Sequence, residues 1–451
     1  MTARRIIFSA LRHAALTPPG RVLLLGCLVI ALAAPAAAKF PASPARPAAP
    51  GVELYVSNPT DDPAGQRLTP LDPRTLADRT DAAVIELGSV PSFWYHEQDQ
   101  DPFNTWIPSA DGSTLLGVEY ATTDVIDRPL RPDEMTFVVR DGRTGFERAR
   151  FHPPGEIWPW PPLILSRDGS RLVIEGMRHR PETSGGEFPR WYVVDTKDGR
   201  LVSTLDATAP EHWGSWLDPA GRRLYYLAAP RGLQSTTPWP VRIVAHDLTT
   251  GDEVARVVLA DVPFGVWETA QDQWAEARPG LALSPDGRQL AVVHPDRSAV
   301  VLIETERFTV ERTVVLRQPA SRLDRLVGLL PLVPRDAAAK SAARMYVGAA
   351  YGPDGRRLYL HWREDRPDDA EEPRRLGLAV VDLASGTILA ESPLDDDSWV
   401  QHIMPAPDGR SVYVYVGSVL QRHDASTLKI LAERRFVGFR WFVLRPLAPD
   451  G

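Results

Sequence analysis

Cysteine is almost absent from this chain. Cys27 is the only one, and it lies within the first fifty residues. A single thiol forms no intramolecular disulfide and no thiolate metal cluster, so neither is expected in the folded part. The sequence also has no GxSxG elbow, Walker loop or CxxCH haem-attachment motif. These absences count against serine-nucleophile hydrolysis, nucleotide hydrolysis and covalent haem binding.

Acidic residues are also absent before Glu53, although four arginines occur in residues 1–21. An apolar run follows at residues 22–34, and residues 36–38 are the small residues that an export peptidase accepts. The arrangement predicts an export signal at residues 1–38, and therefore a periplasmic or cell-surface protein. Residues 39–50 are rich in Pro and Ala and predict a stiff tether.

Two alternatives for residues 1–38 stay open. The segment is an uncleaved membrane anchor in the first, although its apolar run is shorter than the roughly 20 residues that span a bilayer. In the second, the Leu-Leu-Gly sequence before Cys27 is a lipobox with an unusual Leu, and the chain is a lipoprotein. Either alternative gives a membrane tether through residues 1–38.

The balance of charge is acidic. The formal net charge is −7, and loss of residues 1–38 removes four arginines and no acidic residue, which leaves −11. Nucleic acids and anionic lipids require clustered Lys and Arg. We therefore expect no nucleic-acid partner.

One short phrase recurs throughout the chain. Residues 281–293, LALSPDGRQLAVV, have two stretches of alternating apolar residues on either side of Pro-Asp-Gly, which predicts two strands and a tight turn. Similar phrases place turn glycines at residues 112, 169, 221, 287, 355, 409 and 451.

A second unit follows each hairpin. It is an apolar strand that ends in an acidic residue, then a short turn that usually contains Gly, then another strand, as in residues 137–151 and 376–392. An Asp side chain accepts hydrogen bonds from the N–H groups of such a turn, and Gly tolerates positive φ. We therefore predict that the acidic residue has a structural role.

Together the two hairpins make a four-stranded antiparallel unit, and a ring of such units is a β-propeller. We predict an all-β, seven-bladed propeller over residues 51–451. The C-terminal stretch from Phe442 supplies an innermost strand, and the stretch from Val52 supplies the strands outside it. Pairing of N- and C-terminal strands in one blade would close the ring and remove free sheet edges.

The stretch Tyr55-Val56-Ser57-Asn58, the Asp-x-x-Thr/Ser-Gly turns and the Pro-Asp-Gly hairpins resemble the YVTN-type seven-bladed propeller repeats. That superfamily includes the heavy chain of amine dehydrogenases and relatives of lactonases. The resemblance implies a WD40-like fold over about residues 51–451. It implies no activity, because these motifs form turns and strands.

The long insertions are predicted on one face of the propeller. Residues 123–134, 178–190, 229–240 and 362–375 connect second strands to third strands, and residues 260–280 and 317–345 connect blades. Loops on a rigid scaffold are where binding and catalytic residues concentrate. This face is the predicted functional face, with a simple cap over the channel as the alternative.

Candidate binding residues precede the innermost strands at this face. They are the aromatic and imidazole side chains of Trp106, Trp158, Trp160, His212, Trp213, Trp274, Trp399 and His402. Indole rings stack on flat ligands, and a histidine near a carboxylate serves as a base or a ligand. The alternative is that each tryptophan wedges between adjacent blades. No spacing of the HExxH kind occurs, so no metal and no cofactor is expected.

These observations favour an exported, non-catalytic propeller that binds a protein partner or a small ligand on its long-loop face. The alternative is an enzyme or enzyme subunit that resembles the amine dehydrogenase heavy chain or lactonase-like propellers, with His212 and His402 at its site. A structural envelope protein held by its N-terminus is a third possibility.

Overall fold

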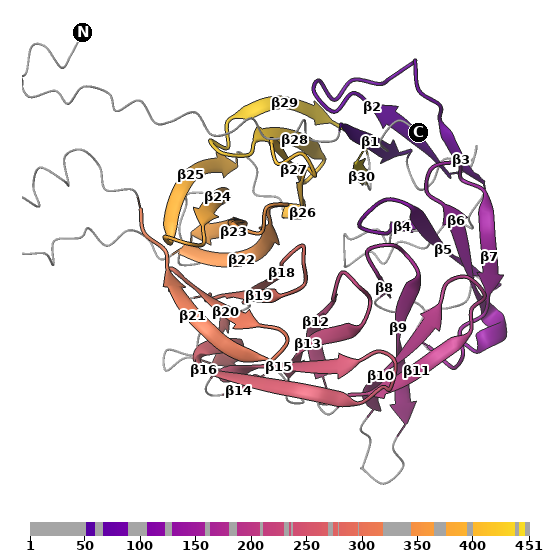
Figure 1. Cartoon of the computed structure of the whole chain (residues 1–451), viewed down its shortest axis with the longest axis horizontal. Coiled ribbons are helices and arrows are strands. Elements are labelled where there is room, and N and C mark those ends of the chain that lie inside the picture. The colour runs from indigo at the N-terminus through magenta and orange to yellow at the C-terminus, as the bar shows by residue number, and fades with distance from the viewer. Residues whose placement is uncertain are drawn as a thin grey trace, which may run out of the picture. The chain divides into compact units, whose positions relative to one another are not determined.

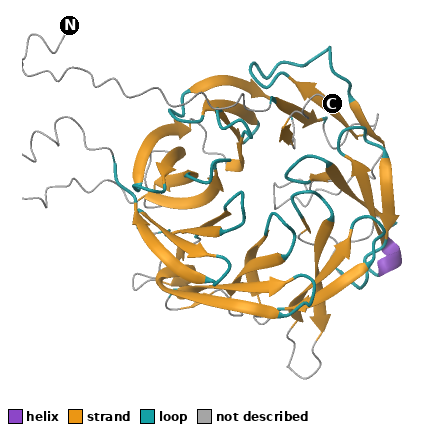
Figure 2. Ribbon diagram, viewed as in Figure 1, coloured by secondary structure: helices purple, strands orange, loops and turns teal. Residues whose placement is uncertain are grey.

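The computed structural model describes residues 51–451 with gaps. The gaps are residues 59–65, 89–105, 122–128, 158–162, 180–186, 208–210, 230–233, 236–237, 269–273, 278, 296, 319–343, 365–375, 395–399, 438–441 and 447–451. Ala49–Gly451 form one compact unit. Figure 2 shows that strands make up nearly all of its regular structure, and the only helical element of the described residues is the 3-10 turn η1 (Pro132–Glu134).

Seven antiparallel sheets form a ring (Figure 1), so the predicted fold class, a seven-bladed β-propeller, is confirmed. From its inner to its outer strand, the first blade contains β30 (Phe442–Pro446), β1 (Val52–Ser57), β2 (Gln66–Leu71) and β3 (Ile85–Gly88). In the same order, the second contains β4 (Trp106–Pro108), β5 (Thr114–Tyr120), β6 (Met135–Asp141) and β7 (Glu147–Phe151). The third contains β8 (Leu163–Leu165), β9 (Arg171–His179), β10 (Glu187–Asp195) and β11 (Leu201–Asp206).

The remaining blades follow in chain order, again from inner to outer strand. The fourth contains β12 (Glu211–Leu217), β13 (Arg223–Ala229), β15 (Trp239–Asp247) and β16 (Glu253–Glu268). The fifth contains β18 (Gly280–Leu283), β19 (Gln289–Val293), β20 (Ala299–Glu304) and β21 (Thr309–Val315). The sixth contains β22 (Arg344–Tyr351), β23 (Arg357–Glu364), β24 (Leu376–Asp382) and β25 (Thr387–Leu394). The seventh contains β26 (Val400–Pro405), β27 (Ser411–Val416), β28 (Val419–Asp424) and β29 (Ile430–Arg435).

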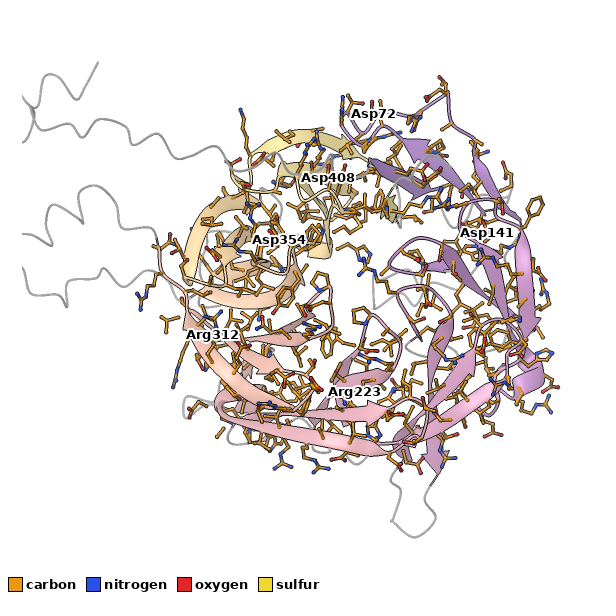
Figure 3. The ribbon with its side chains drawn as sticks, viewed as in Figure 1. Asp72, Asp141, Arg223, Arg312, Asp354 and Asp408 are labelled. Carbon is orange, nitrogen blue, oxygen red and sulfur yellow. The ribbon has the colours of Figure 1, made fainter. Side chains whose placement is uncertain are left out.

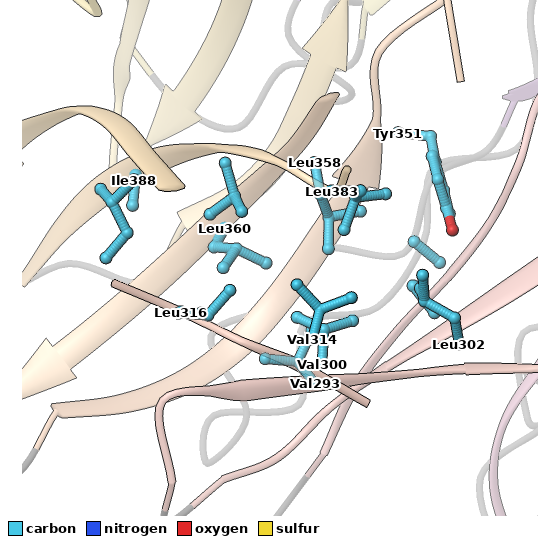
Figure 4. Packing of buried hydrophobic residues seen from close by; sticks show 14 of the residues in the cluster. Val293, Val300, Leu302, Val314, Leu316, Tyr351, Leu358, Leu360, Leu383 and Ile388 are labelled. Carbon is cyan, nitrogen blue, oxygen red and sulfur yellow. The ribbon is translucent and has the colours of Figure 1, made fainter. Parts of the chain in front are cut away.

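The core lies between neighbouring blades. On β20, Val300 and Leu302 face the sixth blade, whereas Val301 and Ile303 face the fourth. Both faces of the strand are buried, which explains why its sequence is an unbroken apolar run. Figure 4 shows the cluster between the fifth and sixth blades, where Val300 and Leu302 meet Leu358 and Leu360 of β23.

The repeated turns have the backbone that the sequence predicts. In the six Pro-Asp-Gly-type hairpins of the described residues, the turn glycine has φ between +65° and +73°. Its N–H donates to the carbonyl of the residue three positions earlier, as from Gly287 to Ser284. The seven turns between third and fourth strands also contain one residue with positive φ each, and in four of them it is glycine.

The fourth blade departs from the prediction for residues 260–280. The sequence predicted a connection there, but β16 continues to Glu268 and pairs with two additional strands, β14 (Gln234–Ser235) and β17 (Trp274–Ala277). The buried side chains of Val262 and Phe264 alternate along this extension. A period of two favours a strand, so the signal was present in the sequence.

Candidate functional site at the connection end

Connections differ in length at the two ends of the blades. At one end, termed the turn end, turns join first strands to second strands and third strands to fourth strands, and they are short except for residues 72–84 between β2 and β3. At the other, termed the connection end, are the links from second strand to third strand and from blade to blade. Residues 180–186, 316–343 and 365–375 are links of this second kind. The antiparallel strand order alone places every such link at the connection end.

Three inner strands carry a β-bulge near the connection end. Their register with the second strand shifts between His212 and Ser215 in β12, between Tyr346 and Gly348 in β22, and between Val400 and His402 in β26. A bulge leaves residues unpaired and redirects side chains, and bulges are frequent next to functional sites. Two of the three bulges involve a predicted site histidine.

Glycine is required at the bulge of β12. Gly214 has φ of +84°, and a Cβ added to it would lie 2.7 Å from the ring of Trp216. A side chain would therefore meet both backbone strain and a steric clash at this position. An isolated Gly within a strand pattern is a sequence signal for a bulge, and the prediction from the sequence did not use it.

His402 offers an imidazole for hydrogen bonding at the connection end. The side chain is half-buried on β26, and burial lowers its pKa below the ordinary value. The imidazole is therefore neutral at neutral pH and offers one hydrogen-bond donor and one acceptor. It makes no hydrogen bond to other residues that the structure describes, so both functions are available to a ligand.

Trp106 is a wedge between blades. Its side chain is only 1% exposed and packs with Leu68 of the first blade and Leu115 of the second. A Cβ on Gly117 would lie 2.7 Å from its ring, so the small residue makes room for the indole. The guanidinium of Arg140 lies 5.4 Å from the ring centroid. This position corresponds to the alternative stated for the tryptophans, in which the indole stabilises the interblade core.

The other predicted site residues are described in part or not at all. Trp158, Trp160 and Trp399 lie outside the described residues. His212 and Trp213 are described in their backbone, which lies on inner strand β12. The backbone of Trp274 lies in β17, which pairs antiparallel with the outer strand β16. The structure thus brings Trp106, His212, Trp213 and His402 to the connection ends of inner strands, although the side chain of Trp106 is buried between blades, and it places Trp274 on the strand next to β16.

The aspartates of the repeated turns are structural, as predicted. Asp141 accepts the backbone N–H groups of Arg143 and Thr144 at 2.9 and 2.8 Å, and Asp424 accepts those of Ser426 and Thr427 at 3.0 and 2.8 Å. Figure 3 labels Asp72 and Asp141 on turns near the rim of the ring and Asp354 and Asp408 nearer its centre. Each of these carboxylates accepts hydrogen bonds from backbone N–H groups of its own turn.

Membrane-spanning helices and metal-binding clusters are both missing from the described residues. No helix there has the length and apolar character needed to cross a bilayer. In the same part of the chain, no three His, Cys, Asp or Glu side chains come together in a group that could hold a metal ion.

Comparisons with known proteins establish no family for this chain. No protein-family model matches the sequence, and no curated protein matches it significantly. Among solved structures, hydrazine synthase from Kuenenia stuttgartiensis matches with a TM-score of 0.43 and 16% identity over 74% of this chain and 80% of that one. The β-propeller domain of Cps50 (Swd1) from Myceliophteria thermophila matches with a TM-score of 0.44 and 12% identity over 74% of this chain and 87% of that one.

Proposed function

We propose that this chain is a non-catalytic binding scaffold that holds a protein partner or a small ligand at its connection end. The observation that carries the proposal is the placement of the longest connections and the three inner-strand bulges at the same end of the ring. Segments of variable length on a rigid frame are the usual means by which a fold acquires a binding surface.

The frame supports this role because its turn end is fixed by local hydrogen bonds. Six hairpin turns repeat one backbone geometry, and apolar clusters lock each blade to the next. Preorganised surfaces lose less conformational freedom on binding than mobile ones. The neutral imidazole of His402 adds a group that can donate or accept a hydrogen bond at that surface.

Site-specific photocrosslinking tests the proposal. A photoreactive amino acid is placed at His402 and at Ser215, both on inner strands, and at Val310 and Glu433 on outer strands as controls. In cells of the native host, we expect one defined crosslinked protein from the inner positions and none from the outer ones. For a small ligand, native mass spectrometry of the purified chain should show a mass adduct that the His402→Ala variant loses.

Three outcomes contradict the proposal. Equal crosslinking from inner and outer positions would mean that contact is unspecific, and a chain with neither crosslink nor adduct has no binding role at this end. Turnover of a lactone or a primary amine that His402→Ala abolishes, with unchanged thermal unfolding, would favour the alternative of an enzyme.

We also propose that the chain acts outside the cytoplasm. The support is the predicted export signal at residues 1–38, with its arginines, its apolar run and its small residues. Mass spectrometry of the protein from soluble and membrane fractions of its host tests this. A soluble form that begins near Lys39 is expected for a cleaved signal. Retention of residues 1–38 in the membrane fraction would instead indicate an anchor, and a cytoplasmic full-length chain contradicts export.

A further inference from the structure

A cavity opens at the turn end, away from the proposed binding surface. It has a volume of about 1060 Å³ and lies between the fourth, fifth and sixth blades. Arg223 of β13 lines it from the fourth blade and Asp354 from the first hairpin turn of the sixth, and both are labelled in Figure 3. The cavity spans three sheets, so no single turn forms it.

The cavity walls are held together across blades. Arg223 donates from Nη1 to the carbonyl of Thr305 at 2.6 Å, which links the fourth blade to the fifth. Thr305 donates from Oγ1 to the carbonyl of Gly287 at 2.6 Å, and Ser284 donates from Oγ to Asp286 at 2.7 Å. Both hairpin turns of the fifth blade are therefore fixed relative to the fourth, and the cavity is a built concave surface.

The lining carries an excess of negative charge. Seven carboxylates and three arginines line the cavity. Two of the arginines are engaged, since Arg222 pairs with Asp218 at 3.3 Å and Arg223 donates to Thr305. Five of the carboxylates form no ion pair in the described part of the chain, namely Asp247, Asp286, Glu304, Glu306 and Asp354.

Hydrogen bonds to two of these carboxylates favour the charged form at neutral pH. The hydroxyl of Ser284 lowers the pKa of Asp286, and the backbone N–H of Arg307 lowers the pKa of Glu304. Asp247 and Asp354 use Oδ1 for the N–H groups of their own turns, which leaves Oδ2 without a partner among the described residues. Arg288 near Asp286 and Arg307 near Glu304 offset part of the negative charge. The remaining excess of carboxylates over arginines around one cavity attracts a ligand of opposite charge.

The residue types of the lining indicate whether the cationic ligand is a small molecule or a segment of a protein. Pockets for small molecules are lined mainly by apolar and aromatic side chains, and here Tyr225 is the only aromatic residue of the lining. Ten of the sixteen lining residues are charged, and a mainly charged lining is typical of surfaces that steer and orient a protein partner. We propose that this cavity receives an arginine- or lysine-bearing segment of a partner protein. The site goes beyond the proposed function, because it lies at the other end of the ring.

Binding of a labelled peptide to the full chain tests this site. The probe is fluorescein-labelled octa-arginine, measured by anisotropy at low and at physiological salt, with an octa-glutamate peptide as reference. The cavity variant is Glu306→Gln combined with Asp354→Asn. The amide introduced by Asp354→Asn keeps an Oδ1 acceptor for the turn, and Glu306 makes no side-chain bond to described residues, so both changes preserve the fold.

The control variant removes the same charge elsewhere. It combines Glu86→Gln with Glu433→Gln, both exposed on outer strands of the first and seventh blades. We expect the cavity variant to weaken octa-arginine binding about tenfold and the control less than about twofold, because only the cavity carboxylates contact the probe. Equal weakening in both variants means unspecific attraction to an acidic chain and overturns the proposal.

Two further measurements test whether the peptide binds in the cavity and whether the ligand is a protein segment or a small polycation. A photocrosslinking group at the centre of the peptide should label residues 218–225, 247, 284–289, 304–311 or 354–355, and labelling confined to other residues overturns the proposal. Spermine should displace the peptide only at concentrations far above the peptide's Kd. Spermine that binds one per chain as tightly as the peptide, and is lost in the cavity variant, identifies a small polycation as the ligand and overturns the assignment to a protein segment.

Discussion

At the scale of single residues, the turns between third and fourth strands show how a repeat adapts to its neighbours. Each has one residue with positive φ, which is glycine in four turns and Leu76, Phe308 or Leu428 in the others. In the turn of Gly386, a Cβ would lie 2.3 Å from the carbonyl oxygen of Val315 in the preceding blade. In the other three turns the large side chain is buried against the preceding blade. The turn requires a positive φ at this position, whereas contacts with the neighbouring blade determine which residue type fits there.

At Phe308, a strained backbone is combined with favourable burial of the side chain. Its φ is +55°, its side chain is 4% exposed, and its ring stacks on that of Tyr225 with centroids 5.9 Å apart. Phe308→Ala should lower the free energy of unfolding by about 3 kcal/mol, because the ring and its packing are lost. Phe308→Gly should be about 1 kcal/mol more stable than Phe308→Ala, because glycine relieves the left-handed strain. Urea unfolding of both variants checks the order, and a Gly variant less stable than the Ala variant contradicts it.

A comparison of Gly386 with Gly355 separates the effect of steric contact from that of backbone strain. Their φ values are +72° and +66°, but nothing lies within 4 Å of a Cβ on Gly355. Gly355→Ala should therefore cost only the backbone strain, about 1 kcal/mol. Gly386→Ala adds a clash with the preceding blade and should cost about 3 kcal/mol. Equal shifts in the urea midpoint would show that the contact with Val315 has no energetic weight.

At the scale of elements, the first blade is assembled from both ends of the described chain. β1 pairs antiparallel with β30, from Val52 with Pro446 to Val56 with Phe442. Arg445 of β30 is 4% exposed and donates to Glu53 at 2.5 Å, to Tyr55 Oη at 3.1 Å and to the carbonyl of Gly142 at 2.7 Å. One guanidinium thus joins β30 to β1 and both to the second blade.

Removal of this guanidinium should destabilise the whole ring. Arg445→Met should lower the free energy of unfolding by about 3 kcal/mol, since it leaves Glu53 without its ion-pair partner in a partly buried position. Arg434→Met is the matched control. Its guanidinium also reaches the first blade, through Asp78 and the carbonyl of Leu76, but it is 31% exposed and should cost less than about 1 kcal/mol. Thermal unfolding compares the two, and an equal loss in both contradicts the role assigned to burial.

At the scale of the whole molecule, buried histidines make the propeller sensitive to acid. Burial lowers the pKa of His246, His402 and His423, and it lowers the pKa of His361 to about 4, with the charge of Arg363 acting in the same direction. The unfolded chain takes up these protons near pH 6.5, whereas the folded chain takes them up at lower pH. Their stabilising contribution is therefore full above pH 6.5 and is lost as the pH falls towards 4.

His361→Gln should reduce this dependence on pH. The wild-type free energy of unfolding should fall between pH 6.5 and pH 4, and about 3 kcal/mol of that fall belongs to His361, whose side chain is buried in the sixth blade. Urea unfolding at the two pH values gives both slopes. The variant should lose less stability than the wild type over this range, and identical slopes would mean that His361 does not titrate abnormally.

The sequence by itself determined the architecture. The repeated Pro-Asp-Gly and Asp-x-x-Thr-Gly phrases predicted seven blades, and the structural role of the turn aspartates followed from the same local chemistry. Such features are readable because a turn is formed by four or five consecutive residues, whose φ angles and hydrogen bonds depend little on the rest of the chain. Trp106 was predicted as a binding residue, and its position between blades matches only the alternative stated for the tryptophans.

Only the tertiary structure decided what depends on neighbouring blades. The cavity at the turn end draws its lining from three blades, and residues 218, 286 and 354 have no proximity in the sequence. The pairing of β14 and β17 with β16, the bulges of the inner strands and the place of Arg445 likewise depend on contacts between distant segments. Local pattern fixes each strand and turn, but the charge, shape and burial of a site arise when separate blades close around it, and these are properties of the assembled ring.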